Sequence, residues 1–186
     1  MREKIYLSCL LACVLGCQGI PPSPNISPDF ETLEEAGFRL RYPNDWKITS
    51  ESETPKAHQK INRYIFRHPQ NKECYVTIEI FSFAKEEGAI SSNEIVSQTT
   101  RSYKDIFKRS GWQPFTFKTR NAKLGDRPVT EILMHGQKNN IERTVSSMIL
   151  PAQNSFYVVT RQWFDHWDQA ARERLKLITN SFELVF

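Results

Sequence analysis

Cysteine is scarce over most of this 186-residue sequence. Three of the four cysteines, Cys9, Cys13 and Cys17, lie within the first 17 residues, and Cys74 alone follows them. Residues 18–186 thus hold a single cysteine, so no disulfide can form within that part of the chain, and its stability must come from packing. Cys74 falls in an apolar stretch without a sequence-marked His partner, which favours a small core residue over a reactive thiol.

The sequence also lacks the motifs that mark common catalytic and metal sites. It has no HExxH, no GxSxG and no glycine-rich turn leading into a helix, which argues against a zinc hydrolase, a serine hydrolase and a phosphate-binding loop. The histidines are dispersed over four segments, at His58, His68, His135 and His166. The closest cluster of potential ligands, Asp165-His166-x-Asp168, starts a predicted helix, where capping accounts for both acids. We therefore expect no enzymatic activity, no metal and no cofactor.

The positive charge of the chain is mild and spread out. The net charge is +4, and Lys and Arg recur without a dense block, whereas a nucleic-acid footprint is a concentrated basic face. We therefore expect no nucleic-acid partner. Hydrophobic residues make up 39% of the chain, including twelve Phe, four Trp and six Tyr. This apolar content and the length predict one folded domain of ordinary size.

The amino-terminal segment is typical of an export signal. An apolar run over residues 5–16 follows Arg2 and Lys4, and it is too short to span a bilayer, which takes about 20 residues. The run ends at Val14-Leu15-Gly16-Cys17, which resembles the lipobox of bacterial lipoproteins. In that family the cysteine thiol carries diacylglycerol, the signal is removed just before it, and the new amino terminus is usually acylated.

This resemblance implies a signal peptide over residues 1–16 and lipidation of Cys17. Cys13, which follows Leu10-Leu11-Ala12, is a rival anchor, and an unlipidated signal peptide with incidental cysteines is the alternative. The regular spacing of the cysteines then has no metal-binding meaning. The residue after the anchor is Gln18 and not Asp, which by resemblance to lipoprotein sorting favours the periplasmic side of the outer membrane.

A proline-rich linker follows the cysteine. Residues 18–29 contain four Pro and no apolar period, and in polyproline geometry such a segment reaches roughly 37 Å. With no internal repeat or second linker after it, we place the lipidated cysteine and linker at residues 17–29 and a single domain at residues 30–186.

Hydrophobic periodicity predicts an order of strands, helix, strands, helix. The predicted strands cover residues 38–48 (with a turn at 43–45), 61–69, 74–83, 112–120, 127–136, 141–150 and 155–163. Helical spacing predicts helices over residues 91–110, with Ser91 and Glu94 as a capping box, and over about residues 166–180. Short turns such as QKNN (137–140) imply antiparallel pairing. The expected fold class is α+β, an α/β/α sandwich whose central antiparallel sheet is flanked by helices.

The opening GFRLRYPNDWKI and the ending LKLITNSFELV resemble the PsbP-like group. That group includes the photosystem II extrinsic protein PsbP and its lipoprotein relatives, the envelope protein DcrB, and a Ran-binding nuclear import factor. The carrying residues are the G-F-x-x-x-Y-P-x-x-W stretch and the closing Ser181-Phe182. The resemblance implies a sandwich around an antiparallel sheet and mostly non-enzymatic binding or assembly roles.

Together these observations predict a membrane-anchored envelope lipoprotein that acts as a non-enzymatic binding or assembly module for another envelope protein. The candidate partner anchors are Trp112, Trp163, Phe164 and Trp167, although each is also explained as an ordinary core or sheet aromatic. A basic helix face at Arg101, Lys104 and Lys108 is a candidate contact with anionic lipid, or a solvated face. The alternative function is a carrier of a small hydrophobic ligand between sheet and helix.

Overall fold

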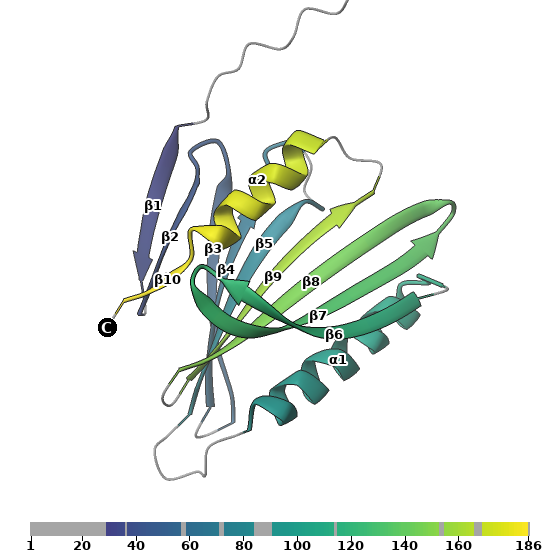
Figure 1. The fold of residues 1–186 in the computed structure, drawn as a ribbon, viewed down its shortest axis with the longest axis horizontal. Helices are drawn as coiled ribbons and strands as arrows, with labels where there is room; N and C mark the ends of the chain where they lie inside the picture. Colours follow the sequence, from purple (N-terminus) through teal and green to yellow (C-terminus); the bar gives the residue numbers. More distant parts are fainter. Residues whose placement is uncertain are drawn as a thin grey trace, which may run out of the picture.

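The computed structural model describes residues 29–35, 37–56, 59–70, 73–83, 91–113, 115–152, 155–165 and 169–185. Their elements, drawn in Figure 1, are in chain order β1 (Phe30–Glu35), β2 (Phe38–Pro43), β3 (Lys47–Lys56), β4 (Gln59–Arg67), β5 (Tyr75–Phe83), α1 (Ser92–Arg109), β6 (Phe115–Leu124), β7 (Arg127–Lys138), β8 (Ile141–Ala152), β9 (Ser155–Phe164), α2 (Gln169–Asn180) and β10 (Glu183–Leu184). Cys9, Cys13, Cys17, His58, His166 and Trp167 lie outside the described residues.

The large sheet is antiparallel throughout and has the strand order β3-β4-β5-β9-β8-β7-β6. Its strands alternate residues between two faces because successive side chains of a strand point in opposite directions. The predicted QKNN turn is confirmed: Asn139 and Asn140, at φ 51° and 62°, connect β7 to β8. Two consecutive positive φ angles suit a tight hairpin, and Asn tolerates them well.

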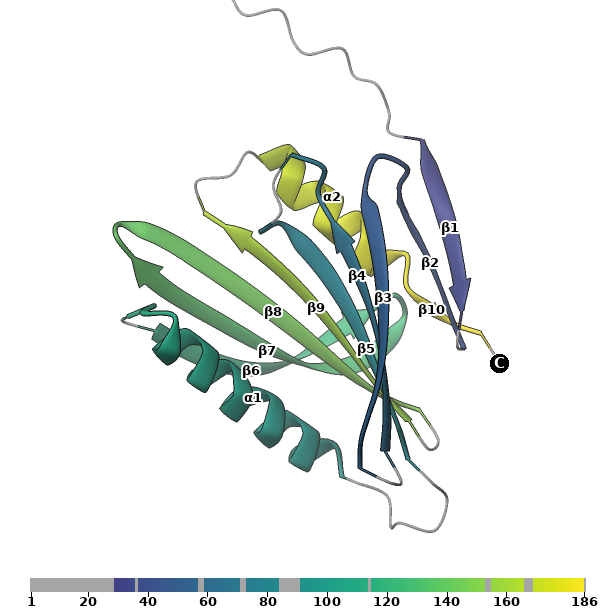
Figure 2. The same cartoon turned by 180° about the vertical axis from the view of Figure 1, so that it is seen from behind.

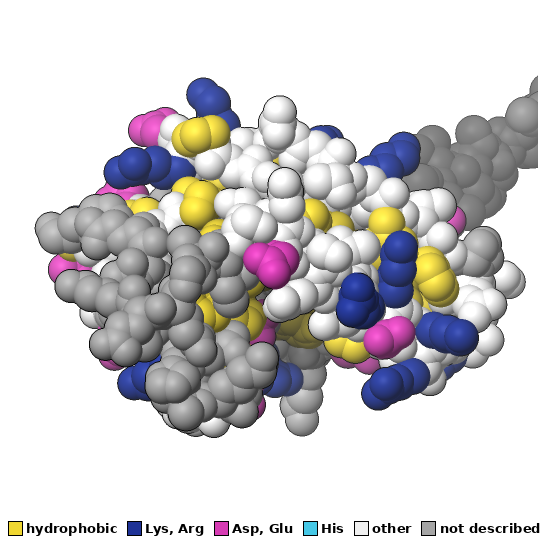
Figure 3. All heavy atoms as spheres, turned by 90° about the horizontal axis from the view of Figure 1, so that it is seen from below, with side chains coloured by type: hydrophobic (Ala, Val, Ile, Leu, Met, Phe, Trp, Pro, Cys, Tyr) yellow, Lys and Arg dark blue, Asp and Glu magenta, His cyan; other side chains and the backbone are white. Residues whose placement is uncertain are grey.

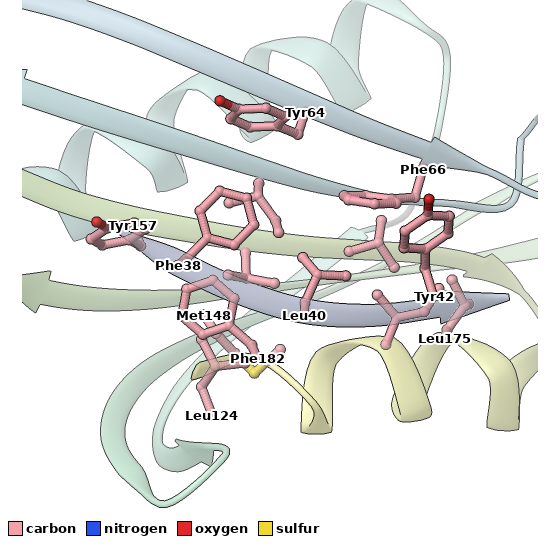
Figure 4. Close-up of a cluster of buried hydrophobic side chains, with 14 of the residues drawn as sticks. Phe38, Leu40, Tyr42, Tyr64, Phe66, Leu124, Met148, Tyr157, Leu175 and Phe182 are labelled. Carbon is pink, nitrogen blue, oxygen red and sulfur yellow. The ribbon is translucent and has the colours of Figure 1, made fainter. Parts of the chain in front are cut away.

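A second, small sheet of order β1-β2-β10 packs against one face of the large sheet. The residues of β2 alternate between buried and exposed, and Phe38, Leu40 and Tyr42 point into the core. Figure 4 shows these side chains meeting Tyr64 and Phe66 of β4, Tyr157 of β9 and Phe182. Phe38 stacks on Phe182 at a centroid distance of 5.6 Å and meets Tyr64 edge-on at 5.3 Å. The interior between the two sheets is therefore largely aromatic.

The predicted fold class, an α+β sandwich with helices flanking a central sheet, is wrong. The described residues are mostly β: ten strands form two antiparallel sheets, accompanied by two helices. Residues 38–48 were expected to form a half-buried strand, a turn at residues 43–45 and a short return or continuation. The turn at Pro43–Asn44–Asp45 is present, and it carries the chain from β2 in the small sheet to β3 in the large one. The strand parity of Phe38 to Ile48 was right, but parity does not specify which sheet a strand joins.

The two helices lie on opposite faces of the large sheet (Figures 1 and 2). Helix α1 contacts β7 and β8, whereas α2 contacts β2, β5 and β9. The predicted capping box of α1 is confirmed, since the Ser91 hydroxyl accepts from the Glu94 N–H and the Glu94 carboxylate accepts from the Ser91 N–H. Gly111, at φ 74°, follows the end of the helix, where a left-handed residue commonly stops it.

Each face of the large sheet is covered over only part of its width. On one face the small sheet and α2 cover β3, β4, β5 and β9, and this side buries the cluster that contains Phe38, Phe66 and Ile178. On the other face α1 covers β6, β7 and β8, and buries the cluster around Phe107, Ile132 and Met134. Two openings in the described part of the chain, one on each face of the sheet, lie next to these covering elements.

Candidate functional site

One opening is a groove of about 530 Å³ between α1 and strands β4 and β5, here called the α1 groove. Its floor alternates aliphatic and cationic side chains along one face of β4: Ile61, Arg63, Ile65 and Arg67. Its helix wall contains Ile95, Thr99, Tyr103 and Ile106. Ile106 is 45% exposed, although it is a large aliphatic residue. Figure 3 shows hydrophobic side chains reaching the surface among charged ones when the molecule is viewed from below.

The middle of the α1 groove carries an ion-pair network centred on Arg63. Its guanidinium lies 2.8 Å from Glu79, 3.3 Å from Glu51 and 3.4 Å from Glu53. Burial lowers the pKa of Arg63, but the hydrogen bond to Glu79 and the charges of the neighbouring carboxylates raise it overall. The positive charge of Arg63 is therefore already balanced within the floor of the groove.

Arg67 and Arg143 line one end of the α1 groove, here called its upper end, and make it more basic than the middle. The Arg143 guanidinium carbon lies 5.0 Å from the ring centroid of Phe107 and 5.4 Å from that of Trp112, and its terminal N–H donates to the amide oxygen of Gln162. Its buried Nε has no hydrogen-bond partner in the described part of the chain. An unpaired buried donor costs about 1–3 kcal/mol, so this Nε is a local cost to the fold and not a contact point for a ligand.

Hydroxyl groups connect α1 to the sheet beneath the groove. Tyr103 donates to Thr160 at 3.2 Å, and Thr160 lies 2.8 Å from the Ser147 hydroxyl. Burial raises the pKa of Tyr103 to about 12, so this phenol stays protonated at neutral pH. These hydrogen bonds link α1 to β8 and β9 beside the groove.

A second opening, of about 270 Å³, lies on the opposite face of the sheet and is here called the α2 cleft. Its lining combines four cations (Arg120, Arg161, Arg172 and Lys176) with His135 and with an apolar set of Leu133, Trp163 and Leu175. Strands β6, β7, β9 and helix α2 each contribute at least one of them. The register of the sheet places them together, since Arg120 lies opposite Glu131, Leu133 opposite Ser146, and Ser146 opposite Arg161.

A buried carboxylate supports two of these arginines. Glu131 is 1% exposed and accepts hydrogen bonds from Arg120 at 2.5 Å and from Ser146 at 2.6 Å, while Arg161 lies 3.6 Å away. Burial acts to raise the pKa of the Glu131 carboxyl, but the hydrogen bonds from Arg120 and Ser146 and the charges of both arginines hold it below its ordinary value. Glu131 is therefore ionised and positions the two guanidinium groups at the cleft.

The predicted partner anchors do not form one surface. Trp112 and Phe164 are 9% and 5% exposed and pack on each other at a centroid distance of 5.6 Å, as the interpretation of ordinary core aromatics expects. Trp163 points to the other face, where it lines the α2 cleft with the Arg161 guanidinium 5.5 Å from its ring. Trp167 lies outside the described residues, as does the lipidation candidate Cys17.

The predicted basic helix face is exposed along α1. Arg101, Lys104 and Lys108 are all exposed, and the Lys104 ammonium lies 5.3 Å over the ring of Phe117 on β6. Cys74 is fully buried in the core between the sheets, as predicted. His68 meets Trp46 edge-on, and the His135 ring nitrogen Nδ1 lies 2.9 Å from the Thr144 hydroxyl.

The residues that sequence reasoning missed are the arginines of the two openings. Arg120, Arg161 and Arg172 belong to three different elements. In the sequence, each looks like an ordinary arginine on the solvent side of a strand or helix. Only the parity of β9 offered a signal, since it separates Arg161 and Trp163 from Gln162. Within the described ranges, no group of three His, Cys, Asp or Glu side chains is placed to hold a metal ion. Among these residues, neither helix has the length and apolar character needed to cross a membrane.

No protein-family model matches the sequence, and no curated protein matches it. Solved structures match at the level of the fold. The solution structure of cyanobacterial PsbP (CyanoP) from Synechocystis sp. PCC 6803 is similar to this chain with a TM-score of 0.59 at 12% sequence identity, covering 91% of this chain and 99% of that one. This chain therefore has a PsbP-like fold, as the sequence resemblance predicted.

Two further solved structures are similar with lower scores. LpqN of Mycobacterium tuberculosis, described as involved in cell envelope biogenesis, has a TM-score of 0.48 at 16% identity and covers 85% of this chain and 91% of its own. A protein from Bacteroides thetaiotaomicron VPI-5482 has a TM-score of 0.46 at 13% identity, with 84% of this chain and 48% of that chain covered. Neither of these lower similarities bears on function.

Proposed function

We propose that this protein is a lipid-anchored, non-enzymatic binding module of the bacterial cell envelope that holds a segment of a partner protein in the α1 groove. The anchor is the predicted diacylglyceryl group on Cys17, or on Cys13 as the rival. The proline-rich residues 18–29 then act as a tether that lets the domain stand clear of the bilayer. Gln18 supports sorting to the periplasmic side of the outer membrane.

The observation that carries this proposal is the lining of the α1 groove. Ile61 and Ile65 offer apolar contacts on the floor, and Ile106 is 45% exposed on the helix wall. Arg67 and Arg143 leave the upper end basic, because Glu79 is engaged by Arg63. A partner segment with spaced apolar side chains and an acidic end matches this arrangement.

The alternative, a carrier of a small hydrophobic ligand, has less support. Both openings carry several arginines, and a neutral apolar ligand would have to displace water from them without pairing with them. The exposed stripe of Arg101, Lys104 and Lys108 on α1 fits a looser role, contact with anionic lipid head groups beside the groove. That contact would orient the domain but would not supply the specificity of the groove.

A site-specific crosslinking experiment tests the proposal. A photoreactive amino acid at Thr99, inside the α1 groove, should capture a discrete envelope protein in intact cells. The same group at Glu173, exposed on α2 on the opposite face, should not capture that protein. Recovery of the same products from both positions, or of none from Thr99, would contradict a partner in the groove.

A pair of matched variants provides the second arm of this experiment. Ile106→Asp places a charge in the groove, and Leu177→Asp makes the same change at an aliphatic residue of α2 that is 50% exposed. We expect Ile106→Asp to reduce capture about tenfold or more, as for the loss of an interface anchor, and Leu177→Asp to leave it unchanged. Equal capture by the two variants would argue against the groove as the contact.

A further inference from the structure

We propose that the α2 cleft binds a small organic phosphate, with Arg161, Arg172 and Lys176 holding the phosphate group and Trp163 contacting the apolar body of the ligand. This site lies on the face of the sheet opposite the α1 groove, so it is independent of the proposed partner site. The cleft has a volume of about 270 Å³, near the lower end of the range of about 300–1,000 Å³ for small-molecule sites.

Cationic side chains converge on the cleft from three elements. Arg120 comes from β6, Arg161 from β9, and Arg172 and Lys176 from α2. Guanidinium groups present their N–H donors in a planar fork that fits phosphate and carboxylate oxygens. Arg161 and Arg172 each have a buried Nε without a hydrogen-bond partner among the described residues. Because both Nε atoms are buried, a ligand would be held by the terminal nitrogens of the two arginines, of which Nη2 of Arg172 already donates to the Asp165 carbonyl.

The carboxylates that face these cations do not balance them fully. Glu131, beneath the floor, is shared by Arg120 and Arg161. Asp165 lies 4.0 Å from Arg172, and Glu173 lies 2.7 Å from Lys176. Four cations thus meet three described carboxylates, and the last two carboxylates, Asp165 and Glu173, are 38% and 50% exposed. A dianion inside the cleft would compete well against such solvent-screened partners.

The state of Arg161 supports an anion at this place. Its side chain is 17% exposed. Burial and the charge of Arg120 hold the pKa of Arg161 below its usual range, although Glu131 acts in the opposite direction. Glu131 therefore balances the positive charge of Arg161 only in part, and a second negative group beside Arg161 would stabilise that charge.

The rest of the lining favours a phosphate ester over free phosphate. Trp163, Leu133 and Leu175 form an apolar part of the cleft next to the cations. Leu175 is already buried, but inorganic phosphate would leave the partly exposed Trp163 and Leu133 in contact with water, whereas an ester with a short aromatic or aliphatic body would cover them. The expected ligand is thus amphiphilic, with a dianionic head and a small apolar group.

Calorimetric titration of the full-length chain, purified in a non-ionic detergent, tests this site. Phenyl phosphate is the probe, and phenol and inorganic phosphate each supply half of its chemistry. We expect saturable binding of phenyl phosphate, weaker binding of inorganic phosphate, none of phenol, and loss of affinity as salt rises. Absence of saturable phenyl phosphate binding at about 1 mM, a weak affinity by any standard, would overturn the proposal.

Charge-removing variants assign the binding to the cleft. We expect Arg172→Gln and Lys176→Gln each to weaken phenyl phosphate binding about tenfold, as for the loss of a charge-assisted hydrogen bond. The matched control is Arg174→Gln, on the same helix but paired with Asp45 outside the cleft, and its affinity should change less than about twofold. Lys176 is 53% exposed, so its variant remains folded even if Arg172→Gln does not. Equal effects of Lys176→Gln and Arg174→Gln would overturn the proposal.

A last arm distinguishes a lipid head group from a soluble ester. Dihexanoyl phosphatidic acid, a water-soluble lipid phosphate, should bind more tightly than phenyl phosphate if the ligand is a lipid, and more weakly if it is a soluble metabolite. Either result supports a phosphate site and names its source. Because the α1 groove variant Ile106→Asp leaves the cleft intact, failure of partner capture and failure of phosphate binding can be told apart.

Discussion

Glu131→Gln removes the charge of a buried carboxylate while keeping its shape. The glutamine amide can still accept a hydrogen bond from Ser146, but it no longer attracts Arg120 and Arg161. In the native protein these two guanidinium groups lie 2.5 Å and 3.6 Å from the carboxylate oxygens, and the carboxylate side chain is 2% exposed. The variant therefore tests whether this carboxylate stabilises the fold through its charge.

The expected cost follows from the exposure of each partner. Hydrogen bonds to a charged group contribute about 1.5–3 kcal/mol and neutral ones about 0.5–1.5 kcal/mol. Arg120 is 59% exposed, so its share is screened and adds no more than about 1 kcal/mol. Arg161 is 17% exposed and lies 3.6 Å from the carboxylate, so losing this looser contact costs about 1.5–2 kcal/mol, less than the roughly 3–5 kcal/mol of a closed buried pair. We expect the free energy of unfolding to fall by about 2–3 kcal/mol in total.

The pH dependence provides the sharper part of this prediction. A carboxyl whose pKa is lowered in the folded state contributes stability that is complete above its unfolded-state pKa, and this stability is lost as pH falls through the folded-state pKa. For Glu131 the unfolded-state reference is 4.5. The difference in stability between wild type and Glu131→Gln should therefore be full at about pH 7 and shrink steadily below about pH 4.5.

Urea unfolding followed by tryptophan fluorescence measures the stability difference between wild type and Glu131→Gln at about pH 7 and below about pH 4.5. Glu173→Gln is the control, because it neutralises a carboxylate that is 50% exposed and pairs with Lys176, and it should change stability by less than about 0.5 kcal/mol. The reasoning would be refuted if Glu131→Gln were equally mild. It would also be refuted if the difference kept the same size at acidic pH.

Three further predictions concern the core, the α1 network and the anchor. Gly136→Ala should destabilise by about 1–3 kcal/mol, measured by thermal unfolding, because the new Cβ would lie 2.6 Å from the buried ring of Phe107. In an alkaline titration followed by phenolate absorbance, Tyr103 should ionise only near pH 12, since burial raises its pKa; Tyr103→Phe should reduce the amplitude of this late step and leave the part that comes from Tyr42, whose pKa is also raised to about 12. Cys17→Ser should release the protein from the membrane fraction and Cys13→Ser should not; the reverse result would identify the rival anchor.

Local features of the fold could be predicted because they depend on neighbouring residues. The capping box at Ser91 and Glu94 predicted the start of α1, and the turn residues Asn139 and Asn140 predicted the β7–β8 hairpin. The small sheet was missed for a different reason. β1 contains three Glu, and its exposed pattern gives no apolar alternation, so it resembled the linker before it. Its pairing with β2 completes the sheet, and no local signal reveals that pairing.

The candidate sites could not be predicted because they depend on the register of distant strands. Arg120 and Glu131 are brought opposite each other by the β6–β7 pairing, and Arg161 joins them only through β8. Trp163 was singled out from the sequence, but together with Phe164, which points to the other face. Aromatic residues are conspicuous in a sequence, whereas the arginines that surround Trp163 become a group only once the strand order is known.

The alternation along β9 also determines where this protein can tolerate changes in length. Arg161 and Trp163 serve the α2 cleft, while Gln162, between them, accepts from Arg143 and Tyr75 at the α1 groove. Insertion or deletion of one residue within β9 would turn all of these side chains to the wrong face, so both openings would be lost in one step. Changes in length must therefore be confined to the connections at the strand ends, while β9 itself can diverge only by substitution.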